Sequence, residues 1–166
     1  MEYENISAEN YIGIDPGING AVAIWNGQSM MSFPLKKSMV EPIRVLNASS
    51  SICCIENVNH YPGMGARSAK TSLVNYGKII GALESSGFIL GESFFIVTAK
   101  EWQGYFGCQR RKPKGKSSKE KSLIYKEHKN DLLSLARRTF PHANISLVNA
   151  DAALIAEYCR RTKHFK

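Results

Sequence analysis

The order of apolar and polar residues along the chain predicts one mixed α/β domain. Short apolar runs bounded by Gly, Pro or Asn predict strands at residues 11–15, 21–25, 29–33, 51–55 and 94–97. The first three runs are close together, and Asn26-Gly27 between two of them is typical of a hairpin turn. Apolar residues at helical spacing predict helices at residues 40–47, 68–86, 98–106, 118–140 and 149–161. Hairpin-connected strands followed by alternating strands and helices indicate a five-stranded mixed sheet flanked by helices.

Length and composition agree with a single domain over residues 1–166. No apolar run approaches the ~20 residues of a membrane span. The polar, acidic start resembles neither a signal peptide nor a transit peptide, so we expect a cytoplasmic protein, or a viral protein acting in the host cell. Cys53 and Cys54 are adjacent, and no cysteine spacing suits zinc, which favours structural thiols in a reducing compartment.

The positive charge of the chain is concentrated in one segment. The formal net charge is +8, with 22 Lys and Arg against 14 Asp and Glu. Between Lys100 and Phe140 there are 12 Lys and Arg and only 4 Asp and Glu, so this quarter of the chain holds the whole excess. Residues 107–118 form its most basic part, and Gly and Pro predict a flexible loop there. Such a block indicates a surface for nucleic acid or another polyanion, or else a solvated charged loop.

Three acids occupy positions that suit a metal site. Asp15 and Glu56 each end a predicted strand, and Asp151 opens the last predicted helix. Strand ends in an open α/β sheet converge on one edge, where ligands bind. Carboxylates that meet there repel one another unless a cation neutralises them, and their hard oxygens suit Mg²⁺ or Mn²⁺. The alternatives are a simple Asp-Pro-Gly turn, a surface glutamate and an acid favoured by the helix dipole.

Several ordered motifs resemble the RuvC-like Holliday junction resolvases, over residues 11–160. The motifs are Gly13-Ile-Asp15-Pro-Gly17-Ile-Asn-Gly20-Ala21, Ile55-Glu56 with its Asn/Gly/Pro loop, Asn75-Tyr76-Gly77 with Gly81, Val97-Thr-Ala-Lys-Glu-Trp102 and Asp151-Ala-Ala-Leu-Ile-Ala156. The sequence is more similar to the shorter phage-type or organellar members than to the cellular bacterial enzyme.

The resemblance implies an RNase H-like fold and a homodimer that cuts four-way DNA junctions with Mg²⁺ or Mn²⁺, two ions per site. Asp15, Glu56 and Asp151 would be the catalytic residues and metal ligands, with Asp15 bridging the ions. Family members usually carry a further acid or His one turn before the last acid, where this chain has Leu147 and Val148. Either Asn149 supplies an oxygen instead, or Asp151 serves alone.

Two segments would then contact DNA. Residues 57–67 follow Glu56, and this loop with the start of the next helix would stack on a base or hold phosphates through His60, Tyr61, Arg67 and Lys70. A polar surface loop is the alternative. The basic block would hold phosphates through Arg110, Arg111, Lys112, Lys114, Lys116, Lys119 and Lys121. In the family, a helix at this place brings a lysine near the scissile phosphate, for which Lys119 and Lys121 are the candidates here.

The sequence therefore predicts a hydrolase, a metal-dependent and structure-selective endonuclease that resolves Holliday junctions in DNA recombination and repair. The alternatives are a less selective RNase H-like nuclease acting on forks, flaps or hybrids, and a junction-binding protein with a degraded site. The helix at 68–86 is apolar on more than one face, which suits a homodimer interface or a helix buried in a monomer.

Overall fold

The computed structural model describes residues 10–17, 19–35, 43, 46, 48–58, 66–111 and 117–163. Most of the helix predicted at residues 40–47 lies outside them. The described elements are β1 (Asn10–Ile14), β2 (Ala21–Trp25), β3 (Met30–Pro34), the 3₁₀ turn η1 (Ala48–Ser50), β4 (Ser51–Glu56), α2 (Ala66–Ser85), β5 (Phe94–Val97), α3 (Ala99–Tyr105), α4 (Ser118–Thr139) and α5 (Ala150–Thr162). Each predicted strand, and each predicted helix other than that at 40–47, is confirmed to within two residues.

The five strands form one mixed sheet in the order β3-β2-β1-β4-β5. β1, β2 and β3 pair antiparallel, whereas β4 is parallel to both β1 and β5. The turn between β2 and β3 forms because Asn26 Oδ1 accepts the backbone N–H of Ser29 at 2.7 Å, while Gly27 takes a positive φ of 87°. An α/β fold with a five-stranded mixed sheet flanked by helices is thereby confirmed.

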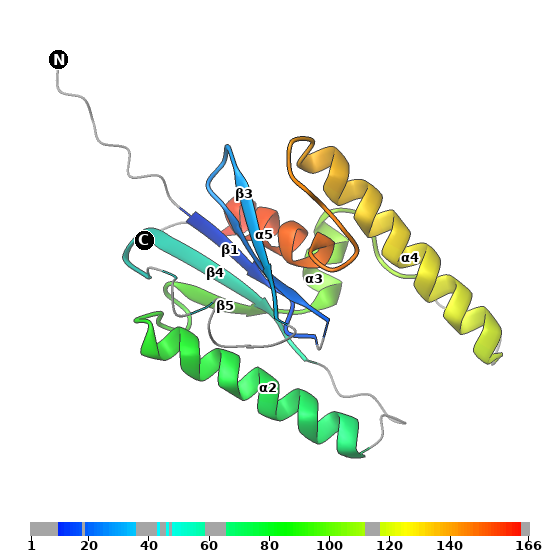
Figure 1. Ribbon diagram of the computed structural model, residues 1–166, viewed down its shortest axis with the longest axis horizontal. Coiled ribbons are helices and arrows are strands. Elements are labelled where there is room, and N and C mark those ends of the chain that lie inside the picture. Colours follow the sequence, from blue (N-terminus) through cyan, green and yellow to red (C-terminus); the bar gives the residue numbers. More distant parts are fainter. Residues whose placement is uncertain are drawn as a thin grey trace.

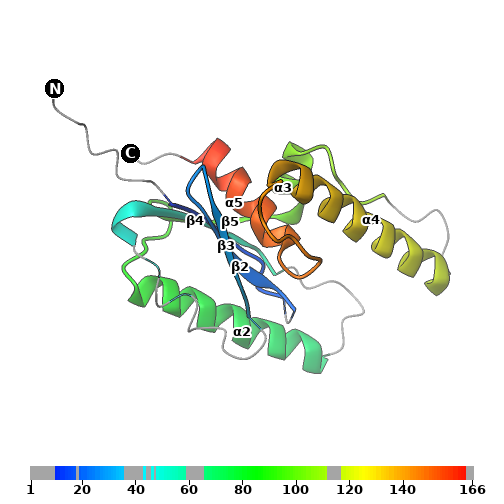
Figure 2. The same ribbon diagram turned by 45° about the horizontal axis from the view of Figure 1, so that its top comes forward.

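The sheet separates two layers of helices (Figures 1 and 2). α2 covers one face, where Ile12 and Ile14 of β1 pack in the same cluster as Ile79 and Leu83 of the helix. α5 covers the other face, and α3 and α4 lie outward from it on the same side. No helix among the described residues is long and apolar enough to cross a membrane.

α5 packs on β1 with backbone close to backbone. Gly13 of β1 makes this approach possible, because a Cβ at that position would overlap the backbone of Ala152 and Ala156. Four alanines of α5 are also buried, at positions 150, 152, 153 and 156. The helix therefore lies tightly on the strand, and its first turn is held next to the residue that follows β1.

Three of the four cysteines are buried and all four are free. Cys54 packs in the core between the sheet and α5, and the Cys159 thiol lies 3.5 Å from the carbonyl oxygen of Ile52. Their place in the core agrees with a structural role for these thiols.

Candidate functional site

The parallel pairing of β1 with β4 brings two acids to one edge of the sheet. Ile14 pairs with Ile55; Asp15 directly follows the end of β1, and Glu56 is the last residue of β4. The loop that follows β1 orients the Asp15 side chain, because Asp15 Oδ1 accepts a hydrogen bond from the backbone N–H of Gly17 at 2.9 Å. Asp151 lies in the first turn of α5 and joins them because that helix packs on β1. This arrangement agrees with the expectation from the sequence that acids at the ends of strands lie together at one edge of the sheet.

The three carboxyl groups affect each other's ionisation. Burial raises the pKa of Asp15, and the negative charge of Asp151 raises it further. Burial and the charge of Asp15 raise the pKa of Glu56 to about 7, with a smaller contribution from Asp151. Since both shifts disfavour the ionised forms, a positive charge placed among these oxygens would be stabilising.

Trp102 of α3 holds one oxygen of Glu56. The fully buried indole donates from Nε1 to Glu56 Oε2 at 2.9 Å. α3 begins at this place because Thr98 and Glu101 form a reciprocal capping box directly after β5. The indole N–H thereby fixes the orientation of the glutamate carboxylate.

Lys129 of α4 holds one oxygen of Asp151. Its Nζ donates a hydrogen bond to Asp151 Oδ2 and forms an ion pair with it. The other oxygen, Oδ1, is buried and accepts no hydrogen bond within the described structure. Asp151 therefore has one oxygen paired with an internal cation and one oxygen with no partner among the described residues.

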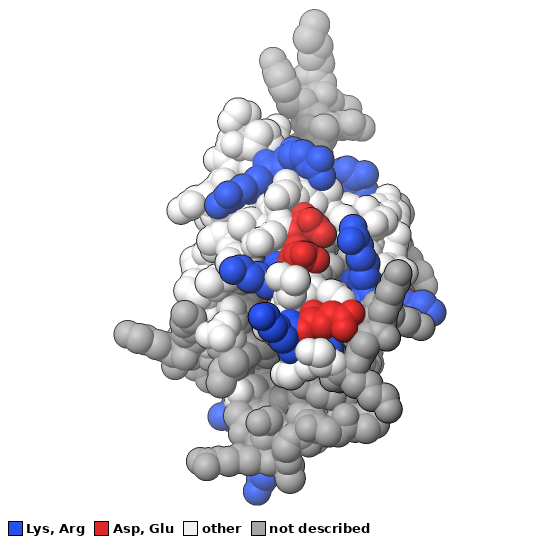
Figure 3. Space-filling model, turned by 90° about the vertical axis from the view of Figure 1, so that its right-hand side faces the viewer, with Lys and Arg blue, Asp and Glu red and all other residues white. Residues whose placement is uncertain are grey.

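A cavity of about 670 Å³ opens beside these acids. It lies between the start of α5, α4 and the region around α3. On the face drawn in Figure 3, Lys and Arg side chains lie around a smaller group of Asp and Glu side chains. The cavity is lined by Glu56, Ala99, Lys100, Gln103, Gln109, Arg110, Arg111, Tyr125, His128, Lys129 and Asp151.

The residues of the site suit a divalent cation in donor type and in charge. Carboxylate oxygens are the ligands that Mg²⁺ and Mn²⁺ prefer, and the unpartnered Oδ1 of Asp151 is such an oxygen. Within the described residues, however, no three His, Cys, Asp or Glu side chains already converge as ligands of one ion. Lys129 is paired with the other oxygen, Oδ2, so an ion bound to this carboxylate would lie beside its ammonium group.

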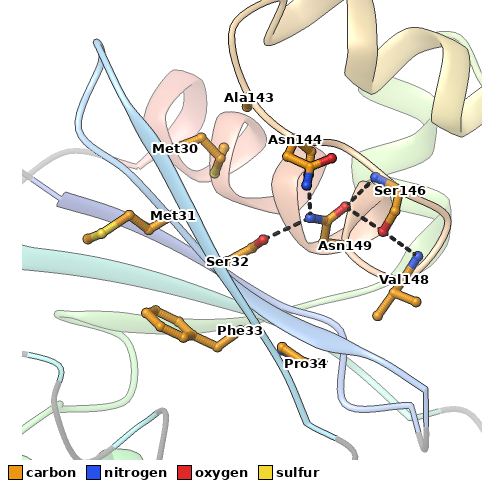
Figure 4. Close-up of a pocket in the computed structure, with 10 residues that line it drawn as sticks. All are labelled: Met30, Met31, Ser32, Phe33, Pro34, Ala143, Asn144, Ser146, Val148 and Asn149. Atoms are coloured by element: carbon orange, nitrogen blue, oxygen red, sulfur yellow. Dashed lines mark hydrogen bonds between the residues drawn. The ribbon is translucent and has the colours of Figure 1, made fainter.

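Asn149 has a structural role in place of the metal-ligating role considered from the sequence. Its Oδ1 accepts the backbone N–H of Ser146 at 2.7 Å, and its Nδ2 donates to Ser32 Oγ at 2.8 Å and to the Asn144 carbonyl at 3.0 Å (Figure 4). The amide thus ties the edge strand β3 to the loop that leads into α5. It lines a second cavity of about 680 Å³ on that side.

Neither residue at the position of the missing ligand supplies an oxygen or nitrogen donor from its side chain. Leu147 is exposed and Val148 is partly buried. The chain therefore lacks the additional ligand that the resemblance leads one to expect.

The predicted DNA contacts fall into three groups. Arg110 and Arg111 are exposed and line the cavity. Lys70 on α2 and Lys119 and Lys121 in the first turn of α4 are exposed but do not line it. The remaining predicted contacts lie outside the described residues, or outside the described side chains in the case of Arg67; they are His60, Tyr61, Arg67, Lys112, Lys114 and Lys116.

The sequence predicts no role at the site for Lys129, or for Trp102 beyond its place in a motif. A signal for the first exists, since Lys129 follows His128 on α4 next to the stripe of buried Leu132 and Ala136, where a lysine is unusual. Trp102 follows a capping-box sequence directly after a strand, which predicts the helix start but not the partner of the indole. Identifying the acid that each one contacts required the tertiary structure.

A further cavity of about 810 Å³ lies along α4. It shares Gln109, Arg111 and His128 with the cavity at the acids, and it also contains Arg137 and Arg138. Glu127 and Asp131 line it too, so its charge is mixed.

No protein-family model matches this chain, and no curated protein matches it. Function is therefore inferred from the residues of the site together with the sequence motifs.

Proposed function

We propose that the protein is a metal-dependent, structure-selective DNA endonuclease that resolves four-way junctions by phosphodiester hydrolysis. The observation that carries this proposal is the meeting of Asp15, Glu56 and Asp151 at one sheet edge, beside a cavity lined with cationic side chains. The five-stranded mixed sheet is compatible with the RNase H-like fold that the sequence motifs imply. The resemblance in sequence motifs is what supports selectivity for junctions, whereas the acids of the site support metal-dependent hydrolysis.

Each acid has a defined part in this proposal. Asp15, Glu56 and Asp151 would hold one or two Mg²⁺ or Mn²⁺ ions, with Asp15 between the other two. The ions would activate water and stabilise the leaving oxygen, which is what divalent metals supply in phosphodiester hydrolysis. Trp102 keeps the Glu56 carboxylate oriented toward the site.

The cationic lining would receive the phosphodiester backbone. Lys100, Arg110 and Arg111 line the cavity with the acids, so a strand lying there would place a phosphate between guanidinium groups and the metal site. Arg137 and Arg138 in the adjoining cavity would contact the same strand further along.

A homodimer would let two such sites cut opposing strands of a junction. α2 lies across the sheet from α5, and Leu73 and Val74 on this helix are about half exposed, at 53% and 49%. Exposed apolar residues at adjacent positions of one helix suit contact with a second copy.

A junction-binding protein that does not cut is the second candidate. Two observations favour it: Lys129 holds Asp151, and the position of the additional ligand is filled by apolar side chains. Such a protein would bind branched DNA through the same cationic cavity.

Cleavage of defined substrates separates these functions. Labelled four-way junction, flap, linear duplex and RNA/DNA hybrid are incubated with the protein in Mg²⁺, Mn²⁺ or EDTA. The proposal predicts cuts in the junction with either metal, none in EDTA, and little cutting of the duplex. Equal cutting of all substrates would favour the less selective nuclease, whereas junction binding without any cutting would favour the second candidate.

A further inference from the structure

The two carboxylate oxygens of Asp151 differ in their hydrogen bonding. Oδ2 accepts a hydrogen bond from Lys129 Nζ, while the buried Oδ1 accepts none within the described structure. The side chain of Asp151 is 8% exposed and that of Lys129 is 27% exposed. The ion pair is therefore largely shielded from water. Opposite charges interact more strongly in such a shielded place than at an open surface.

Lys129 also acts on the neighbouring acids. Its positive charge opposes the upward shift of the pKa of Asp15, and it does the same for Glu56. The ammonium group thus partly neutralises the same three carboxylates that would hold a divalent cation.

The lysine has a second environment within reach. Its Nζ lies 5.9 Å from the ring centroid of Tyr125, one helical turn earlier on α4. The two residues both line the cavity, and the tyrosine side chain is 51% exposed. A lysine that leaves Asp151 would still have a cation–π partner there.

We propose that Lys129 and a divalent cation compete for Asp151, so that metal binding displaces the lysine from Oδ2 toward Tyr125 and the open cavity. This inference rests on the proposed metal-dependent function. Its physical basis is that an ammonium and a metal ion on one carboxylate repel each other, since Lys129 holds Oδ2 and Oδ1 is the oxygen without a partner in the described structure. Lys129 therefore leaves Asp151 when the metal ion binds, and returns to it when the ion dissociates.

Competition has two consequences. The metal binds more weakly than the three carboxylates alone would allow, because it must first replace an internal cation. In addition, the ammonium group of Lys129, which already lines the cavity, is released from Asp151 only when metal is bound. The opposing view is that Lys129 is a permanent support of Asp151, in which case its removal would weaken metal binding.

Mn²⁺ binding to the full-length Lys129→Met variant tests this inference. Mn²⁺ affinity is measured by calorimetry and by electron paramagnetic resonance of free Mn²⁺. Lys126→Met is the matched control, since Lys126 is exposed on the same helix and does not line the cavity. We expect Lys129→Met to bind Mn²⁺ at least about tenfold more tightly than the wild type, and Lys126→Met to bind like the wild type. Unchanged or weaker binding by Lys129→Met would overturn the competition.

The outcomes separate this inference from the proposed function. If the wild type binds Mn²⁺ and Lys129→Met binds no more tightly, competition is wrong while the metal site stands. If neither protein binds Mn²⁺, the metal-dependent function fails, and competition fails with it.

Thermal unfolding provides a second test. In EDTA, Lys129→Met should melt below the wild type, because three mutually repelling acids lose their internal cation. Saturating Mn²⁺ should then raise the melting temperature of the variant more than that of the wild type. Lys129→Gln tests the same loss of charge if Lys129→Met does not fold. Lys129→Arg, which keeps the charge, should bind Mn²⁺ no more tightly than the wild type. A deficit that Mn²⁺ does not reduce would indicate a structural support and contradict the inference.

Discussion

Replacing Glu56 by Gln should stabilise the metal-free protein, and the gain should grow with pH. The carboxyl group is partly buried and faces the charges of Asp15 and Asp151, with Lys129 as a partial counter-charge. These surroundings raise its pKa from 4.5 to about 7. A group with a raised folded-state pKa binds its proton more tightly in the folded protein than in the unfolded chain. Its contribution to stability is therefore lost as the pH rises from 4.5 through about 7.

The size of the effect follows from the shift. Each unit of pKa difference corresponds to about 1.36 kcal/mol, so the wild type loses about 3 kcal/mol of unfolding free energy at this site by pH 8. Glutamine has no proton to lose and is similar in shape, and its Oε1 can still accept the hydrogen bond from Trp102. For a chain of this length, a gain of about 3 kcal/mol corresponds to a rise in melting temperature of roughly 6–12 °C.

The assay is thermal and urea unfolding in EDTA at pH values from 4 to 8.5. We expect Glu56→Gln and the wild type to have similar stability near pH 4 and to diverge above pH 5. The matched control is Glu84→Gln, which makes the same change at an exposed position on α2. A stability difference that is independent of pH, or a Glu56→Gln protein that is less stable at pH 8, would refute the reasoning.

Four further predictions concern the surroundings of the site. Trp102→Phe removes the hydrogen bond donated to the Glu56 carboxylate, which favours the ionised form. In an NMR titration of protein with ¹³C-labelled glutamate side chains, the midpoint of Glu56 should therefore lie at a higher pH in the variant than in the wild type. Asn149→Ala should lower the unfolding free energy by about 2–4 kcal/mol in urea titrations, because buried hydrogen bonds to the loop and to β3 are lost. Gly13→Ala should cost about 3 kcal/mol or more in the same assay, because its Cβ overlaps the backbone of α5. Junction binding should weaken about 10³–10⁵-fold between 50 and 200 mM salt if 6–10 phosphates are contacted.

Each of these has a clear contrary result. An unchanged glutamate midpoint in Trp102→Phe would mean that the indole does not act on that carboxylate. An Asn149→Ala protein as stable as the wild type would mean that the hydrogen bonds of Asn149 to Ser146, Ser32 and Asn144 do not hold the loop to β3. A Gly13→Ala protein as stable as the wild type would place α5 further from β1, and a flat salt response would exclude phosphate contacts as the source of affinity.

Much of the fold could be predicted because the local patterns are strong. Local residues indicate where elements begin and end, as in the hairpin at Asn26-Gly27, the apolar run of β4 and the helices that stop at Gly. The predicted ends agree with the structure to within two residues. The edge position of Asp15 and Glu56 follows from the parallel pairing of β1 with β4, and the convergence of strand ends in an open α/β sheet already indicated it.

The contacts that link distant elements could not be predicted. Lys129 reaches Asp151 across 22 residues, and Trp102 reaches Glu56 across 46, so neither pair has a local pattern. The resemblance pointed to Lys119 and Lys121, because family members place a lysine of the helix at this position near the scissile phosphate. The structure instead brings Lys129, further along α4, to the acids, since the buried residues of this helix decide which turn approaches α5. Asn149 illustrates the same limit, because its partner Ser32 lies 117 residues away.

Cleavage by Asp15→Asn tests the central claim most directly. Single-turnover cutting of an end-labelled four-way junction in Mg²⁺ is compared for the wild type, Asp15→Asn and the control Glu84→Gln, with folding checked by circular dichroism. We predict that Asp15→Asn cuts at least about 10²-fold more slowly, because a carboxylate central to a metal-assisted hydrolysis is worth several kcal/mol, while Glu84→Gln cuts like the wild type. Junction cleavage by Asp15→Asn at the wild-type rate would contradict the account.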